Sequence, residues 1–449
     1  MKEQKTLMTE GRIWKILIRF AFPLLLGNLF QQLYNAVDSL VVGNFCGDDA
    51  LAAVSSSGSM THLLIGFFQG VFVGASVIIS RRYGAKDEEG VDEAVHTTIV
   101  FSLVTGILLS VLGVVFTPMI LRWMGTPENV LPNSVLYFRI YCMGLLGLVL
   151  YNTSNGIFQA LGDSRHPLYY LIISSLVNVV LDLLFVGVFH MGVAGAALAT
   201  VLGQCLSAVL GFLHLMSGKF VVKVELKRLA INTATLLSVF SLGIPSGLQN
   251  CINSAANLVV QSNINKFGDI AMAGCGSYSK IQAFVFIPVL SLALALTTFV
   301  GQNIGAGRMD RVRKGIKEGT WMSVGMAELF GISVWFLAPV LVGMFSKNPQ
   351  VVSYGVMQAR TECLFFFLLA FTHAASGALR GLGETITPMI ITISVWCVLR
   401  IAYITILIRR FHDIRVVFSA YPVTWMISSA LLLVFLAKNL RKEIGELHI

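Results

Sequence analysis

The sequence predicts an all-α membrane protein of twelve transmembrane helices, arranged as two six-helix lobes related by a pseudo-two-fold axis along the membrane normal. Three observations support this prediction: a charge-poor composition, a series of long apolar segments and an internal repeat. Of the 449 residues, 56% are hydrophobic and only 12% are charged, whereas a soluble domain has about 25% charged residues. So few charges cannot cover a surface in water, but a surface that faces lipid needs none.

The apolar segments set the number of spans. A bilayer core about 30 Å thick requires roughly 20 apolar residues of helix. Pro23, Pro245 and Pro288 lie inside such segments, where a proline removes a backbone hydrogen bond and favours a kink; we expect Pro23 to be a bending point of the first span. Twelve segments meet the length criterion, namely 16–42, 53–80, 94–118, 134–159, 166–189, 192–216, 236–264, 271–300, 318–345, 354–379, 387–409 and 416–437.

The basic residues predict the orientation. The net charge is +9, and most of the 32 Lys and Arg residues lie in short segments between the spans, as the positive-inside rule describes. If the N-terminus is cytoplasmic, 22 of them face the cytoplasm and 8 face the other side. An even number of spans then places both termini in the cytoplasm. The polar, basic start is expected to lead into the first span and not to be a cleaved signal peptide, and the charge pattern argues against nucleic acid as a partner.

An internal repeat divides the chain in two. A shift of 221 residues aligns residues 160–163 with 381–384 and Pro167 with Pro388. Because each repeat contains six helices, both repeats cross the membrane in the same direction. Repetition alone would also follow from duplication of a stable bundle, but paired lobes suit alternating access. We expect an N-terminal lobe at 1–216, a cytoplasmic linker at 217–235 and a C-terminal lobe at 236–449.

Several polar residues fall inside the predicted spans. A charge at the centre of a span costs about 2.5–3.5 kcal/mol on insertion scales, so such residues are usually paired or functional. Asp38 lies in the first span and Asp182 in the fifth. The fourth, fifth and sixth spans add four uncharged candidates, namely Asn152, Asn155, Asn178 and Thr200. Asn152 and Asn155 share one helix face, and Asn178 and Asp182 share another.

The repeat provides a control for this acidic cluster. Under the 221-residue shift Asp182 aligns with Tyr403 and Asn178 with Leu399, while Asp38 falls on Val259 or Val260. A group that only holds the bundle together would tend to recur in both halves. The asymmetry therefore favours a functional site in the N-terminal lobe, although interhelical hydrogen bonding by the two aspartates is the structural alternative.

Two carboxylates among amides and hydroxyls can take up a proton or hold a cation by its oxygen ligands. Either event changes the local charge by one unit and can bias a helix that bends at Pro23. We expect no cofactor, and no metal other than Na⁺, which could bind at the Asp38/Asp182 cluster in place of H⁺. The seven cysteines form no metal-ligand pattern, and the sequence contains no phosphate-binding loop. Nothing in the sequence indicates an enzyme.

Two further charged residues lie in the C-terminal half. We expect Glu362 near a water-filled mouth. Arg400 is expected to snorkel towards the membrane surface or to form a pair across the interface between the lobes.

The sequence resembles the multidrug and toxic compound extrusion (MATE) family, and within it the bacterial DinF-like branch. The resemblance covers almost the whole chain and depends on Pro23, residues 34–38, 81–85, 155–156, 160–163 with Pro167, and 178–182. It implies export of organic, often cationic, compounds in exchange for H⁺ or Na⁺. In relatives with an N-lobe acidic site, the coupling centre is formed by positions matching Asp38, Asp182, Asn178, Asn155 and Thr200, with Tyr34, Tyr137 and Asn152 around it.

Other relatives in this family carry coupling acids in the C-terminal lobe, but the seventh span, 244–266, contains none here. The leading hypothesis is a proton- or sodium-coupled exporter in the cell membrane, acting as a monomer on small drug-like molecules. A flippase for a lipid-linked precursor is the alternative; it would favour a cavity lined by Arg and Lys, and these spans contain few buried bases. A membrane scaffold or receptor would not need paired carboxylates.

Overall fold

The computed structural model describes residues 7–46, 48–123, 125–128, 130–218 and 222–446, and the side chains of these residues except those of 46–63 and 442–446. In the described residues the regular secondary structure is entirely helical. This agrees with the all-α membrane fold expected from the composition.

The contacts within the chain define two units. The N-terminal unit contains Met1–Leu7 and Leu26–Gly243, and the C-terminal unit contains Met8–Leu25 and Ile244–Ile449. The division therefore falls inside two helices, and not within the segment 217–235 that the sequence suggested as a linker.

Each of these two divided helices contributes to both units. Helix α1 (Ile13–Cys46) contains Pro23, two residues before the division, and α8 (Thr233–Asn265) contains Pro245 just after it. The first part of α1 belongs to the core of the C-terminal unit, where Leu17 is completely buried. The rest of α1, which carries Asp38, belongs to the N-terminal unit.

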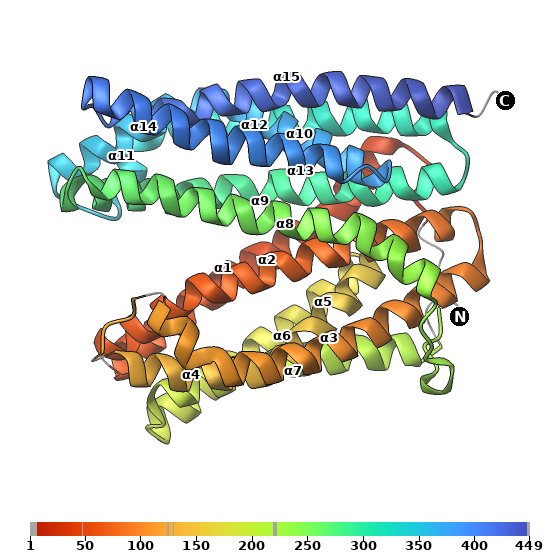
Figure 1. Ribbon diagram of the computed structural model, residues 1–449, viewed down its shortest axis with the longest axis horizontal. Helices are drawn as coiled ribbons and strands as arrows, with labels where there is room; N and C mark the ends of the chain where they lie inside the picture. The colour runs from red at the N-terminus through yellow and green to blue at the C-terminus, as the bar shows by residue number, and fades with distance from the viewer. Residues whose placement is uncertain (1–6, 47, 124, 129, 219–221, 447–449) are drawn as a thin grey trace. The chain divides into compact units, whose positions relative to one another are not determined.

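In the N-terminal unit the helices cross back and forth between two ends (Figure 1). Helix α7 packs against α5 and α6, and α3 packs against α4 and α5. We call the end where α7 meets the segment after Met216 the linker end; its apolar core joins the adjoining ends of α2, α3 and α5 to Val222 and Val224. The elements are α2 (Asp48–Gly84), α3 (Glu88–Trp123), α4 (Leu131–Met143), α5 (Leu145–Ala160), α6 (Arg165–Asp182), the π-helix η1 (Leu183–Val188), α7 (Gly192–Met216) and the 3₁₀ turn η2 (Leu226–Arg228).

In the C-terminal unit, α9 is the central helix and contacts α10, α11 and α12, while α15 covers α11, α12 and α14 (Figure 1). The elements after α8 are α9 (Asp269–Gly305), α10 (Met309–Gly343), α11 (Pro349–Glu362), the 3₁₀ turn η3 (Cys363–Phe365), α12 (Phe366–Gly381), α13 (Ile386–Thr392), the π-helix η4 (Ile393–Leu399), α14 (Arg400–Phe411) and α15 (Arg415–Glu446).

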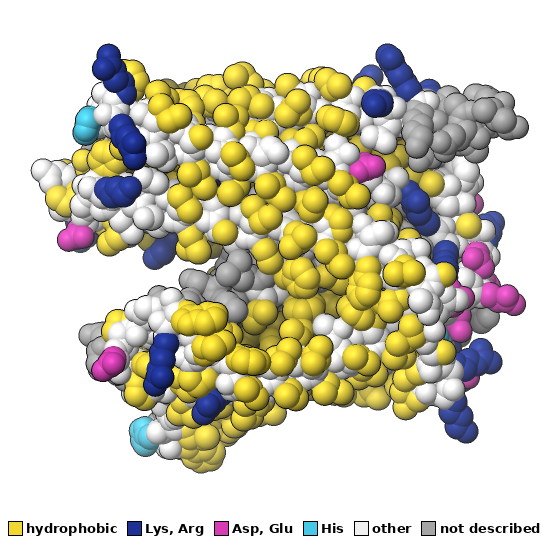
Figure 2. Space-filling view, viewed as in Figure 1, with side chains coloured by type: hydrophobic (Ala, Val, Ile, Leu, Met, Phe, Trp, Pro, Cys, Tyr) yellow, Lys and Arg dark blue, Asp and Glu magenta, His cyan; other side chains and the backbone are white. Residues whose placement is uncertain are grey.

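The helices suit a bilayer in length and composition. Among the described residues ten helical segments pass as membrane spans, or eleven if α4 and α5, bent by 48° to one another, are one span. Helix α8 was expected as the seventh span and is 33 residues long. It is not one of these ten segments, and the Asn and Gln residues spread along it lower its mean hydropathy. In both units apolar side chains cover the middle of the visible helices, and Lys and Arg gather at the ends (Figure 2).

The sequence repeat has a structural cause in a turn that both units use. Gly162 after α5 and Gly383 after α12, aligned by the 221-residue shift, both have positive φ angles, of 83° and 74°. This conformation favours glycine. The next residue then caps the following helix: the Asp163 carboxylate accepts the N–H of Arg165, and the Glu384 carboxylate accepts that of Thr387.

Candidate functional site

Asp38 and Asp182 meet in the interior of the N-terminal unit. Both are buried, and they lie close enough for their charges to interact. Within the described residues, neither carboxylate oxygen of Asp182 takes part in a hydrogen bond, and the same is true of Oδ1 of Asp38. A buried carboxylate without hydrogen bonds is costly. The pair therefore offers oxygen atoms that a proton or a small cation would stabilise.

Three hydroxyl-bearing side chains surround the pair. Tyr34, one turn before Asp38 on α1, interacts with both aspartates and shares a hydrogen bond with Thr200 of α7. Tyr137 of α4 also lies within electrostatic range of Asp38, Asp182 and Tyr34. Four helices thus converge on one polar centre, which we call the acidic site.

Asn178 extends the acidic site along α6. It lies one turn before Asp182 and is buried, and neither its Oδ1 nor its Nδ2 takes part in a hydrogen bond within the described residues. Gly203 of α7 faces it so closely that an added Cβ would lie 3.1 Å from the Asn178 Cβ. A larger residue at position 203 would displace the amide.

Asn152 and Asn155 form their hydrogen bonds away from the acidic site. The Asn152 amide donates to the carbonyl oxygen of Leu148 over 2.9 Å, and Asn155 bonds with Tyr151. Both partners belong to α5 itself. The structure thus brings together six of the eight site residues that the sequence suggested, whereas these two are in contact with their own helix.

A local change of helix type accompanies the acidic site. The α-helical hydrogen bonding of α6 ends at Asp182, and the π-helix η1 follows directly. Such π segments are rare and are often found at functional sites. The sequence showed no sign of this change.

The C-terminal unit contains a buried acid of its own. Glu362, at the end of α11, is completely buried and accepts hydrogen bonds from Tyr278 (3.2 Å), Gln282 (2.8 Å) and Gln358 (2.9 Å). The expected position near a water-filled mouth is therefore wrong. Three polar neighbours satisfy the carboxylate inside the bundle and replace water.

Arg400 is also buried, directly after η4. Its Nε and Nη2 donate to Thr424 Oγ1 over 3.2 and 2.8 Å, its guanidinium carbon lies 4.5 Å from the ring centroid of Tyr421, and its charge acts on Glu362. Arg400 therefore does not snorkel, and the partners named here all belong to its own C-terminal unit.

The two buried clusters occupy related positions in the repeats. The 221-residue shift places Glu362 on Tyr141, Gln358 on Tyr137 and Tyr421 on Thr200. The acids come from α1 and α6 in the N-terminal unit and from α11 in the C-terminal unit. Comparison of aligned positions alone could not find Glu362, because it aligns with a tyrosine and not with an acid.

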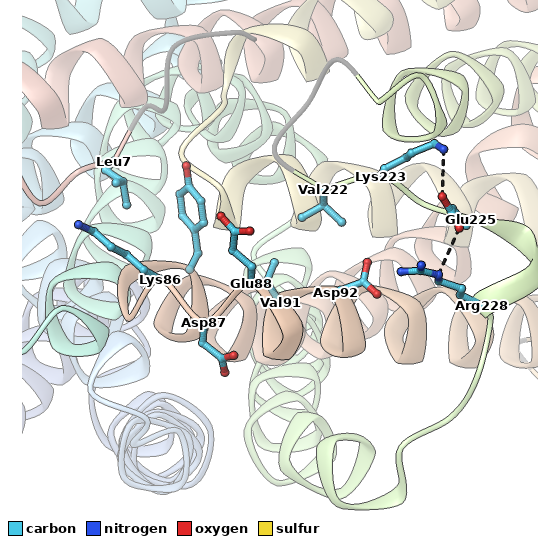
Figure 3. Close-up of a pocket in the computed structure, with 11 residues that line it drawn as sticks. Leu7, Lys86, Asp87, Glu88, Val91, Asp92, Val222, Lys223, Glu225 and Arg228 are labelled. Atoms are coloured by element: carbon cyan, nitrogen blue, oxygen red, sulfur yellow. Dashed lines mark hydrogen bonds and ion pairs between the residues drawn. The ribbon is translucent and has the colours of Figure 1, made fainter.

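A pocket of about 210 Å³ opens at the linker end of the N-terminal unit (Figure 3). The turn between α2 and α3 contributes Lys86 and Asp87, the start of α3 contributes Glu88, and the segment after α7 contributes basic and acidic residues. Glu225 lies between Lys223 and Arg228 and pairs with both, at 2.9 and 3.2 Å (Figure 3). The hydrogen bond from Lys223, together with the charges of Lys223 and Arg228, holds the pKa of the exposed Glu225 below its usual range. Three basic and four acidic side chains line the pocket, and this mixture of signs suits docking of this segment onto α3 better than capture of a charged ligand.

Comparison with known proteins agrees with this architecture. The MatE family model matches residues 23–184 and again 245–406, so the two matches reproduce the repeat seen in the sequence. The probable multidrug resistance protein YoeA of Bacillus subtilis is 30% identical over 405 residues, 88% of each chain. The probable multidrug resistance protein YpnP of the same organism is 27% identical over 392 residues, covering 87% of this chain and 88% of that one.

A solved structure shares the fold. The crystal structure of MATE in the bent conformation superposes with a TM-score of 0.93 at 23% identity, covering 99% of each chain. The likeness covers both repeats from end to end.

Proposed function

Because the chain belongs to the MATE family, we propose that it is a secondary active efflux antiporter that exports organic, often cationic, compounds in exchange for H⁺ or Na⁺. The observation that carries the proposal is the pair of buried carboxylates, Asp38 and Asp182, whose oxygens form few hydrogen bonds within the described chain. Two such carboxylates attract a coupling ion and an organic cation alike. Competition between the two for one acidic site is the simplest basis for exchange.

Helix α1 offers a route from ion binding to movement. Its first part packs in the C-terminal unit, and the part with Tyr34 and Asp38 belongs to the N-terminal unit. Pro23 lies beside the division and removes one hydrogen bond from the helix. A charge change at Asp38 would act on a helix that both units share, which is the kind of element that alternating access requires.

The substrate class follows from the relatives. Several of them are called multidrug resistance proteins, and the acidic site with its tyrosines suits flat organic cations, which aromatic faces also attract. We further propose a monomer in the cell membrane with both termini in the cytoplasm. The alternative, a flippase for a lipid-linked precursor, would need bases free to meet a phosphate. Arg400 is instead held by Thr424 and Tyr421.

Efflux of ethidium from proteoliposomes tests the proposal, with pH and sodium gradients imposed separately. The native chain should drive efflux under at least one gradient. Asp38→Asn and Asp182→Asn should abolish this efflux while the folded protein still elutes as a single species. Asp87→Asn, at the surface of the linker end, is the matched control and should transport normally. Gradient-driven efflux at the native rate in both site variants would refute the coupling role.

A further inference from the structure

Helix α6 carries a line of polar residues that leads away from the acidic site. His166, Tyr170, Ser174, Asn178 and Asp182 recur at every fourth position. Residues four apart lie on one face of an α-helix. At 1.5 Å per residue the line is about 24 Å long, most of the depth of a bilayer core, and it ends at the linker end.

Helix α7 faces this line with polar residues of its own. Thr200, Ser207 and His214 recur at seven-residue intervals, which is nearly two helical turns. Ser207 Oγ donates to Ser174 Oγ over 2.5 Å. The Tyr170 hydroxyl shares a hydrogen bond with His214 Nδ1, also at 2.5 Å. We call these eight residues of α6 and α7 the polar seam.

The linker end of the polar seam is a group of imidazoles. The rings of His166 and His214 lie with their centroids 4.3 Å apart, and His166 is bonded to the carboxylate of Asp163 in the turn before α6. The His166 side chain is 23% exposed, so this end reaches water. The titratable residues around His166 are Asp163, Tyr169, Tyr170 and His214. At the other end of the polar seam, the titratable residues around Asp182 are Asp38, Tyr34 and Tyr137.

We propose that the polar seam is a proton path between Asp182 and the linker end of the N-terminal unit. The inference rests on the proposed function and deepens it by naming the coupling ion as the proton. A proton leaves the Asp182 carboxyl, each hydroxyl of the path passes its own proton on as it accepts the next, and the imidazoles of His214 and His166 release a proton to water. Successive residues are about 6 Å apart along the axis, so each step needs a bridging water. The unbonded Asn178 amide is placed to hold the first such water, next to Asp182.

Helix packing alone does not account for this arrangement. A serine pair across two helices is a common interhelical bond. Packing does not require a phenol and two imidazoles where α6 meets α7. Nor does it require the Asn178 amide, neither of whose polar atoms is hydrogen-bonded within the described residues. Each of these groups can donate, accept or orient a proton. Sodium, in contrast, would require several oxygen ligands at each step.

Neighbouring residues of the same type on α6 supply matched controls. Tyr170→Phe and Ser174→Ala remove hydroxyls from the polar seam, whereas Tyr169→Phe and Ser175→Ala remove them one position away. Two readouts are compared in proteoliposomes: ethidium efflux driven by a pH gradient, and ethidium counterflow without a gradient, which needs no net proton release. We expect each seam variant to lose about tenfold or more in gradient-driven efflux and to keep its counterflow. The two control variants should resemble the native chain in both assays.

Chemical rescue distinguishes proton transfer from structural damage. His166→Ala should slow gradient-driven efflux, and imidazole added on the linker side should restore it, because a small base can replace the lost side chain. Two results would overturn the proposed path. One is normal gradient-driven efflux in both Tyr170→Phe and Ser174→Ala, and the other is a loss of efflux in His166→Ala that imidazole does not restore. If these variants are active but Asp182→Asn is not, the path fails and the proposed function stands. If Asp182→Asn is also fully active, the proposed function fails as well.

Discussion

The carboxylate of Asp182 on α6 lies within electrostatic range of the carboxylate of Asp38 on α1. The two residues are far apart in the sequence of the N-terminal unit, and α1 is divided between the two units. Binding of one proton between them would remove a repulsion and change the charge at a helix that continues past Pro23. The relationship therefore links ion binding to a structural element that can transmit it.

Helix packing in the N-terminal unit depends on a close glycine contact. A Cβ built on Gly74 of α2 would lie 2.5 Å from the backbone nitrogen of Gly243 in α8. Backbone atoms cannot move aside cheaply, so Gly74→Ala should destabilise the protein by about 1–3 kcal/mol and lower its thermal midpoint in detergent. Gly276→Ala in α9 is the control, because no atom lies within 4 Å of the added carbon. Equal midpoints for both variants would show that the contact is not tight.

Glu362 and Arg400 should depend on each other for stability. Arg400 acts on Glu362 electrostatically without forming a salt bridge with it in the described residues, and each side chain has its own buried hydrogen bonds. Losing such a bond in a buried site costs about 1–3 kcal/mol, so Arg400→Gln and Glu362→Gln should each have a lower thermal midpoint.

The double variant Glu362→Gln/Arg400→Gln should lose less stability than the sum of the single losses. Arg409→Gln, exposed near the end of the same helix as Arg400, should change little. Additive losses would mean that the two charges do not interact.

Asp163 should make the stability of the N-terminal unit depend on acidic pH. Burial raises the pKa of Asp163, but the hydrogen bond and charge of His166 and the backbone N–H groups of Arg165 and His166 outweigh it and hold the pKa below its usual range. A carboxylate with a depressed pKa in the folded state stabilises fully above its unfolded value, about 3.9, and this stability is lost as pH falls through the folded value.

Thermal midpoints between pH 3 and pH 6 test this expectation. The native chain should lose stability below about pH 4, and Asp163→Asn should lose less over the same interval. Glu89→Gln, which changes an exposed carboxylate of α3, should retain the native pH profile. If Asp163→Asn lost as much stability between pH 6 and pH 3 as the native chain, the Asp163 carboxylate would not be the source of the pH dependence.

Patterns with a strong local cause could be predicted from the sequence. The repeat was visible because Gly162 and Gly383 both need a positive φ angle, and the sixth span, expected at 192–216, coincides with α7. The meeting of Asp38 with Asp182 was expected from the resemblance to the MATE family, in which matching positions form one coupling centre. In these cases a single residue type carries most of the information.

Features that depend on neighbours in space could not be predicted. The break of the fourth span at Gly144 and the π-helix after Asp182 depend on packing against other helices. Glu362 was misplaced because its three hydrogen-bond donors come from two helices, α9 and α11. Ser174 and Ser207 gave no signal, because a lone serine in a span is ordinary until its partner across the helix pair is known.

Proton release on substrate binding tests the central claim most directly. Purified protein in weakly buffered detergent solution is mixed with ethidium in the presence of a pH indicator, and binding is followed in parallel by fluorescence. The account predicts that the native chain releases protons as ethidium binds, and that Asp182→Asn and Asp38→Asn bind ethidium with much smaller release. Native-sized release in both variants, or ethidium binding to the native chain without any release, would contradict it.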